Sequence, residues 1–214
     1  MLVEYTTVAG PGEAVLVEKK SKFIAQVRPV SSVEEAEAFV EMVRKEHWSA
    51  THNVPAYIIG VNQNIQKFSD DGEPSGTAGL PILEIMKAYN VVNAAVVVTR
   101  YFGGTLLGRG GLIRAYGAAA KEALLNAGIV RMAPATRVKV TVDYTAAGKL
   151  ENELLSAGIT ISGTEYMADV TFDLLLLAGQ EQRAQELVRE LTAGRYSWSV
   201  EGQFYHRVAV DPSL

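Results

Sequence analysis

The chain has 214 residues, of which 48% are hydrophobic and 21% charged, and its formal net charge is −4. This balance is typical of a globular protein with one large or two small domains, and it argues against electrostatic adhesion to nucleic acid over the whole surface, although not at a local basic site. The lack of cysteine excludes disulfides, thiolate nucleophiles and cysteine-ligated zinc. No apolar run reaches the roughly 20 residues of a membrane span, and residues 1–12 lack the pattern of a secretory signal, so we expect a cytoplasmic protein with no membrane partner.

The first 130 residues predict strands and helices in alternation. Period-two alternation or short apolar runs predict strands at 13–20, 22–29, 56–60, 63–68 and 93–99. Apolar residues at helical spacing predict helices at 32–47, 81–89 and 112–127. Ser31 and Ser32 each precede a glutamate by three residues, which is the capping-box pattern. Gly128 is placed to end the last of these helices.

The second part of the chain repeats this alternation in a different order. Pro134 interrupts the pattern, so we predict an N-terminal domain at 1–132 and a C-terminal domain at 136–214. Strands are predicted at 136–143, 159–166, 170–177 and 196–210, and helices at 145–157, capped by Thr145, and 180–193. The order β-α-β-β-α-β is that of the ferredoxin-like split unit. The leucine run 174–177 predicts either a central strand or an interface.

A glycine-rich loop, here called the 103–111 loop, stands between the 93–99 strand and the 112–127 helix. Its glycines are Gly103, Gly104, Gly108, Gly110 and Gly111, and the arginines around it are Arg100, Arg109 and Arg114. A strand, a glycine loop and a helix in this order direct backbone N–H groups at an anion. The spacing nearly matches a phosphate loop, but Arg109 replaces its lysine and Gly110 its hydroxyl residue, which excludes a standard nucleoside triphosphatase. Alternatively, the glycines only permit tight turns and close helix–sheet packing.

A second loop, the 70–79 loop, precedes the helix predicted from Pro81. Its polar residues are Asp70, Asp71, Glu73, Ser75 and Thr77. Its carboxylates are of the kind that ligate a hard cation, but the sequence lacks the EF-hand pattern and is also ordinary turn chemistry, so we expect no metal and no cofactor. Thr77 and Gly79 are expected to present free amides at a helix N-terminus. Two loops that each open a helix could then face one site.

The remaining chemistry-bearing residues do not form a catalytic set. His52 lies in an expected polar loop after a helix, where a hydrogen-bonding role is favoured over that of a general base. The histidines 47, 52 and 206 have no metal-ligand spacing, and no nucleophile elbow occurs. Tyr101 beside arginines suits stacking on exposed bases. Phe102 is expected in the core.

Two long motifs carry a specific resemblance to a known family. They are FSDDGEPSGTAGLPIL at 68–83 and VTRYFGGTLLGRGGLIRAY at 98–116, with KSKFIA at 20–25 and ATHN at 50–53. Over residues 14–130 the chain resembles the YigZ/IMPACT family, and the remainder is similar to the small C-terminal domain of bacterial members. The resemblance implies an α+β protein whose N-terminal domain has the left-handed β-α-β fold of a ribosomal small-subunit protein. It also implies a ferredoxin-like C-terminal domain similar to domain V of elongation factor G.

The resemblance also directs the functional hypothesis. Eukaryotic members regulate translation under amino-acid stress through a kinase that bacteria lack. We therefore expect a non-catalytic binding protein that contacts RNA, the ribosome or translation factors, with Arg100, Arg109 and Arg114 on phosphate. One alternative is an enzyme or sensor that binds a phosphorylated small molecule or nucleotide at the two loops. Another is a protein-binding adaptor.

Overall fold

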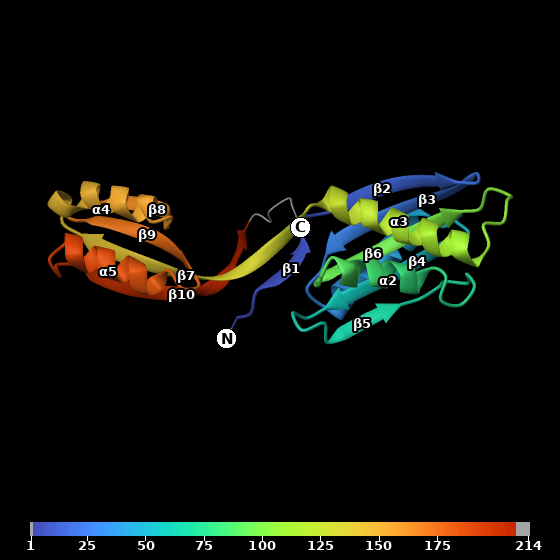
Figure 1. Ribbon diagram of the computed structural model, residues 1–214, viewed down its shortest axis with the longest axis horizontal. Coiled ribbons are helices and arrows are strands. Elements are labelled where there is room, and N and C mark those ends of the chain that lie inside the picture. Colours follow the sequence, from blue (N-terminus) through green and yellow to red (C-terminus); the bar gives the residue numbers. More distant parts are fainter. Residues whose placement is uncertain (1, 209–214) are drawn as a thin grey trace. The chain divides into compact units, whose positions relative to one another are not determined.

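The computed structural model describes residues 2–208 and shows an α+β protein with two five-stranded sheets (Figure 1). It consists of two compact units, one at Glu4–Arg131 and one at Met132–Arg207, to which Val3 also belongs. Within the described residues, no helix is long and apolar enough to cross a membrane.

The N-terminal unit contains an antiparallel sheet with the strand order β2-β3-β6-β4-β5. Its strands are β1 (Tyr5–Val8), β2 (Gly12–Glu18), β3 (Ser21–Pro29), β4 (His52–Ile59), β5 (Ile65–Phe68) and β6 (Ala94–Tyr101), of which β1 lies outside this sheet. Its helices are α1 (Val33–Glu46), α2 (Gly79–Ala88) and α3 (Arg109–Ala127). Ser32 caps α1 by accepting from the Glu35 N–H at 3.2 Å, as one of the two capping boxes predicts.

The central strand β6 is buried on both faces, which explains its continuous apolar sequence. Ala94, Val96 and Val98 lie in one core with α2 and α3, whereas Ala95 and Val97 lie in a second core with α1. Helices therefore cover both faces of the sheet, α1 on one and the α2–α3 pair on the other. Alternate residues of one strand serve the two cores because successive side chains point to opposite faces.

Three predicted boundaries beside the glycine loop are wrong. β6 extends through Arg100 and Tyr101, because Tyr101 pairs with Lys22 on one side and Arg100 with His52 on the other. For the same reason His52 begins β4 rather than lying in a loop. α3 begins at Arg109, so Gly110 and Gly111 belong to its first turn. The helix starts there because Gly108, at φ +74°, turns the chain and its carbonyl accepts from the Leu112 N–H at 3.0 Å.

The C-terminal unit has the predicted element order β-α-β-β-α-β. Its elements are β7 (Ile129–Val142), α4 (Tyr144–Ser156), β8 (Thr160–Tyr166), β9 (Val170–Leu177), α5 (Glu181–Leu191) and β10 (Ser197–Val208). β9 lies between β7 and β8, and β10 pairs with β7. The leucine run is therefore in a central strand, and α4 and α5 share one core with it. Residues 209–210 of the predicted last strand lie outside the described residues.

Two local predictions in this unit are wrong. β7 continues through Pro134, because the ladder with β9 begins only at Ala135, so the missing N–H of the proline falls outside that ladder. Asp143 rather than Thr145 caps α4, since its carboxylate accepts from the Ala146 N–H at 3.0 Å.

Candidate nucleic-acid interface

The 70–79 and 103–111 loops lie together in the N-terminal unit, where they line one hollow of about 380 Å³. They are joined directly, because Arg109 donates from Nη2 to the Ser75 carbonyl at 3.3 Å. β4 contributes His52, and the end of β6 contributes Arg100. Strand pairing thus brings together residues that are up to about 60 positions apart.

The floor of this hollow is a buried ion pair between Arg100 and Glu73. Arg100 Nη1 lies 2.6 Å from Glu73 Oε1, and the two side chains are only 6% and 4% exposed. Tyr116, which is fully buried in α3, donates its hydroxyl to the same oxygen at 2.7 Å. Burial and the adjacent Glu73 carboxylate raise the pKa of Tyr116 far above its ordinary value, so the hydroxyl remains a donor. Arg100, predicted to meet phosphate, has its guanidinium committed to the interior.

Aromatic rings enclose the guanidinium of Arg100 on two sides. Its Cζ lies 5.5 Å from the ring centre of Phe23 and 5.4 Å from that of Phe102. Phe102 is 46% exposed, so its predicted core position is wrong. It is the first residue after β6, where the chain leaves the two cores and its N–H donates to Thr51 Oγ1. Tyr101 is half-buried, with its hydroxyl 3.0 Å from His47 Nδ1.

Asp70 is a helix cap in this structure. Its Oδ1 accepts from the N–H groups of Ala78 (3.1 Å) and Gly79 (2.9 Å), and its Oδ2 accepts from that of Gly76 (2.8 Å). The Thr77 N–H donates to the Pro74 carbonyl at 3.0 Å. The predicted free amides at Thr77 and Gly79 are therefore wrong, because the Pro74 carbonyl accepts from Thr77 and the Asp70 side chain, nine residues upstream, accepts from Gly79.

The other acidic residue of this loop, Asp71, is also bound within the protein. Its Oδ2 accepts from the Asn53 N–H at 2.7 Å, and its Oδ1 lies 3.6 Å from Arg44 Nη2. Over residues 2–208, no group of three or more acidic or histidine side chains is arranged to hold a metal ion.

His52 faces the hollow with one ring nitrogen. Its Nδ1 lies 2.7 Å from the Asp71 carbonyl oxygen. Because a carbonyl only accepts, Nδ1 carries the proton, and Nε2 of the neutral ring is an acceptor. Nε2 lies 3.8 Å from Glu73 Oε1, which is beyond hydrogen-bonding distance.

Close packing or a positive φ requires glycine at most of the glycine positions in the 103–111 loop. A Cβ on Gly103 would lie 2.0 Å from the Lys20 carbonyl carbon, and one on Gly111 would lie 2.9 Å from the Leu107 Cβ. Gly104 and Gly108 have φ values of +83° and +74°. Gly110 has neither constraint, because a Cβ there would meet only Arg114 Nη1 at 3.7 Å. The alternative that glycines serve turns and packing thus accounts for four of the five.

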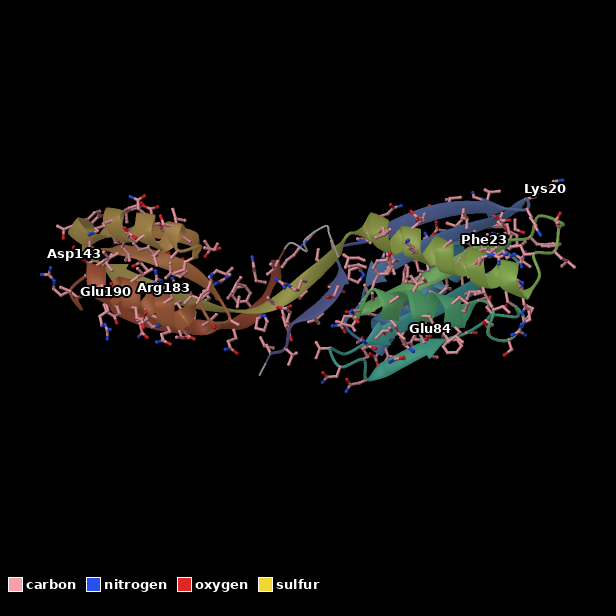
Figure 2. All side chains as sticks on the ribbon, in the orientation of Figure 1. Lys20, Phe23, Glu84, Asp143, Arg183 and Glu190 are labelled. Carbon is pink, nitrogen blue, oxygen red and sulfur yellow. The ribbon has the colours of Figure 1, made fainter. Side chains whose placement is uncertain are left out.

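Exposed cations lie at the β2–β3 turn, on the 103–111 loop and on the first turns of α3. We call this group the basic end: it consists of Lys19, Lys20, Arg109 and Arg114, all exposed. Figure 2 shows Lys20 at the tip of the β2–β3 hairpin beside the loop that precedes α3. The two lysines were missed in the sequence, although the pair KK at 19–20 was a signal for them. Phe102 and Leu106, 82% exposed, provide apolar surface on the same loop.

The β2–β3 turn holds its two lysines in an unfavourable backbone conformation. Lys19 and Lys20 have φ values of +45° and +68°, between the paired residues Glu18 and Ser21. A two-residue hairpin turn with positive φ at both residues is ordinarily formed by Asn-Gly or a similar pair. Lysines at both positions carry a conformational cost that no packing contact offsets, since both side chains are exposed.

Comparison with known proteins places both units among described sequence families. Residues 19–124 match the Impact N-terminal domain, and residues 140–195 match a domain of unknown function, DUF1949. IMPACT family member YvyE of Bacillus subtilis is 44% identical over 195 residues, which cover 91% of this chain and 90% of that protein.

More distant relatives agree with these matches. IMPACT family member YigZ of Escherichia coli is 38% identical and covers 80% of this chain and 85% of its own. Protein IMPACT of Rattus norvegicus is 36% identical over 44% of this chain and 31% of its own. A crystal structure described as that of a hypothetical protein aligns over all of both chains with a TM-score of 0.60 and 32% identity.

Proposed function

We propose that this chain, which belongs to the IMPACT family, is a non-catalytic, cytoplasmic protein that binds RNA of the translation machinery through the basic end of its N-terminal unit. The observation that carries the proposal is the set of four exposed cations on the 103–111 loop, the start of α3 and the β2–β3 turn, whose Lys20 lies beside Gly103. The net charge of −4 disfavours binding of a polyanion over most of the surface. A local group of cations favours its binding at this one place.

The apolar residues on the same loop favour RNA over a simple anion. Phe102 presents nearly half of its surface, and Leu106 most of it. Unpaired bases stack on aromatic side chains such as Phe102, while arginine and lysine contact the adjoining phosphates. An inorganic anion would make no favourable contact with the apolar side chains of Phe102 and Leu106.

The strained turn is a second support. Asn-Gly would adopt the same turn at a lower cost in free energy. Residues that occupy a strained conformation in spite of such a cost are typical of functional sites. At this turn the side chains are two lysines that point to solvent next to Gly103. Their presence at positive φ favours a role in binding rather than in folding.

We also propose the two fold types that the family resemblance implies. In the C-terminal unit, the first strand β7 pairs with both β9 and β10, and β9 pairs with β8, which supports a ferredoxin-like unit similar to domain V of elongation factor G. In the N-terminal unit, the crossovers β3-α1-β4 and β5-α2-β6 run in opposite directions across the sheet. Their strands are also oppositely oriented, and their helices lie on opposite faces. The two crossovers therefore differ in hand, so one of them is left-handed, whereas nearly all parallel β-α-β crossovers in proteins are right-handed. This supports the left-handed β-α-β unit of the ribosomal protein.

The proposal is tested by the salt dependence of RNA binding. Fluorescence anisotropy with a labelled RNA hairpin is measured between low and physiological salt for the wild type, Arg109→Ala and the control Lys121→Ala, which removes the same charge further along α3. We expect the slope of log K against log salt to fall by about 0.7–0.9 for Arg109→Ala, one phosphate contact, and to stay unchanged for Lys121→Ala. Equal slopes in all three proteins, or no RNA binding by the wild type, would refute the proposal.

A protein partner is the main competing function, and the same preparation distinguishes it. A pull-down from a cell extract is treated with nuclease before elution. If the proteins recovered with this chain are lost after nuclease treatment, RNA joins them to it and the proposal is supported. If one protein is retained at full yield after nuclease, the chain is a protein-binding adaptor.

A further inference from the structure

The hollow beside the basic end contains hydrogen-bonding atoms that the protein does not use, and one of them, Arg100 Nε, is buried. Glu73 makes all its side-chain contacts through Oε1, so that within residues 2–208 its Oε2 has no partner, although the side chain is only 4% exposed. His52 Nε2 has no partner within hydrogen-bonding distance in the same part of the chain. Arg100 Nε is buried without an acceptor. Buried polar groups are normally satisfied, so Arg100 Nε calls for a ligand or for ordered water, whereas Glu73 Oε2 and His52 Nε2 are acceptors with accessible surface.

The walls of the hollow suit a flat ring. Phe102, Leu106, Leu107 and Leu112 line it together with the polar groups. Its volume of about 380 Å³ is in the range of pockets for small organic molecules, which combine mostly apolar walls with a few fixed polar atoms. A water cluster would satisfy the polar atoms but would leave the exposed Phe102 and Leu106 unexplained.

The unused polar atoms have a defined character. Arg100 Nε–H is a donor, Glu73 Oε2 is an acceptor, and Nε2 of His52 in its Nδ1–H tautomer is a second acceptor. A base that complements one donor and two acceptors must offer one acceptor and two donors. The Watson–Crick edge of guanine does so, with O6, N1–H and the 2-amino group. Uracil and cytosine each offer one donor and two acceptors, and adenine offers one donor and one acceptor.

The mouth of the hollow provides for the phosphate of such a nucleotide. Gly108 and Arg109 line it at the start of α3. No side chain caps this helix at Gly108, so its first N–H groups and the Arg109 guanidinium are available to an anion. The buried unpartnered Nε of Arg100 is the independent indication of a ligand, and the helix start only adds to it.

We infer that this hollow binds one unpaired guanine nucleotide of the RNA, the base against Phe102 and Leu106 and its phosphate at the start of α3. This inference rests on the proposed function and specifies which element of the RNA the site reads.

The test uses four RNA hairpins that differ in a single unpaired loop base, with the full chain in each case. We expect the guanine hairpin to bind at least about tenfold more tightly than the uracil hairpin, the equivalent of a hydrogen bond or more. Leu106→Ala removes a wall that is 82% exposed and is expected to abolish the preference without changing the salt slope. Leu125→Ala, an exposed leucine on α3, is the matched control and should keep it.

The outcomes separate this inference from the proposed function. Equal affinities for the four hairpins, with a normal salt slope, would overturn the guanine pocket and leave RNA binding intact. A guanine preference that survives Leu106→Ala would place the base elsewhere and also overturn it. Failure of all four hairpins to bind would overturn the proposed function and the pocket together. A guanine preference lost only in Leu106→Ala supports both.

Discussion

Arg100 and Glu73 form a 2.6 Å ion pair beneath the hollow, and neither side chain is more than 6% exposed. The pair joins the end of β6 to the 70–79 loop, and Tyr116 ties it to α3. It therefore fixes the two loops against each other, so that Arg100 is a structural element of the site.

Removing one partner of this pair is expected to be costly. Arg100→Met leaves an unpaired buried carboxylate, and we expect the free energy of unfolding to fall by about 3–5 kcal/mol. In the double variant Arg100→Met/Glu73→Met no buried charge remains, so its loss should be smaller than the sum of the two single losses. Urea unfolding of the wild type and the three variants gives the coupling. Strict additivity would show that the pair is not coupled.

The β2–β3 turn is expected to trade stability against binding. Lys19→Asn/Lys20→Gly places residues that tolerate positive φ in the turn, and we expect the free energy of unfolding to rise by about 1 kcal/mol. The same double variant removes two cations from the basic end, so RNA affinity should fall. Thermal unfolding and anisotropy are measured on one preparation. An increase in stability with unchanged RNA affinity would remove these lysines from the interface.

Two glycines of the same loop are expected to respond in opposite ways to alanine. Gly103→Ala places a Cβ 2.0 Å from a backbone carbon of the β2–β3 turn, where no flexible side chain can yield, and we expect a loss of about 1–3 kcal/mol or more. Gly110→Ala meets no obstacle in the first turn of α3, and we expect a gain of up to about 1 kcal/mol. Chemical denaturation measures both. A similar loss in the two variants would contradict the packing geometry.

Tyr116 is expected to make stability depend on alkaline pH. Its pKa in the folded protein is raised above the value of about 10 in the unfolded chain, so its contribution is complete below that pH and decreases above it. The slope is up to about 1.4 kcal/mol for each pH unit. Tyr116→Phe should be less stable near neutral pH, because Glu73 loses a donor, but its stability should fall less steeply above pH 10.

The matched control for this measurement is Tyr166→Phe, at a tyrosine that is 62% exposed in the C-terminal unit. Its unfolding curve should keep the alkaline slope of the wild type, since the hydroxyl is in water in both states. Unfolding is followed by denaturant titration at several pH values between 8 and 11. Identical slopes for the wild type and Tyr116→Phe would show that Tyr116 titrates alike in both states.

The sequence alone determined the elements and the family. Alternation and helical spacing located the strands and helices of both units, and the two long motifs at 68–83 and 98–116 identified the family over most of the chain. These properties are local, because propensity, capping and periodicity act over a few residues. Local patterns failed at Arg100 and His52, which continue strands because they pair with each other across the sheet. They also failed at Pro134, which β7 tolerates because the missing N–H lies outside the ladder with β9.

Only the tertiary structure decided what the charged residues of the motifs do. Arg100 and Asp70 have the chemistry of an anion contact and a cation ligand, but one meets Glu73 and the other caps α2. Which partner a charge takes depends on contacts between residues far apart in the sequence, and desolvation makes a buried pair preferable to a buried single charge. The same long-range packing left Lys19, Lys20 and Arg109 in solvent, and the proposed function depends on these exposed residues.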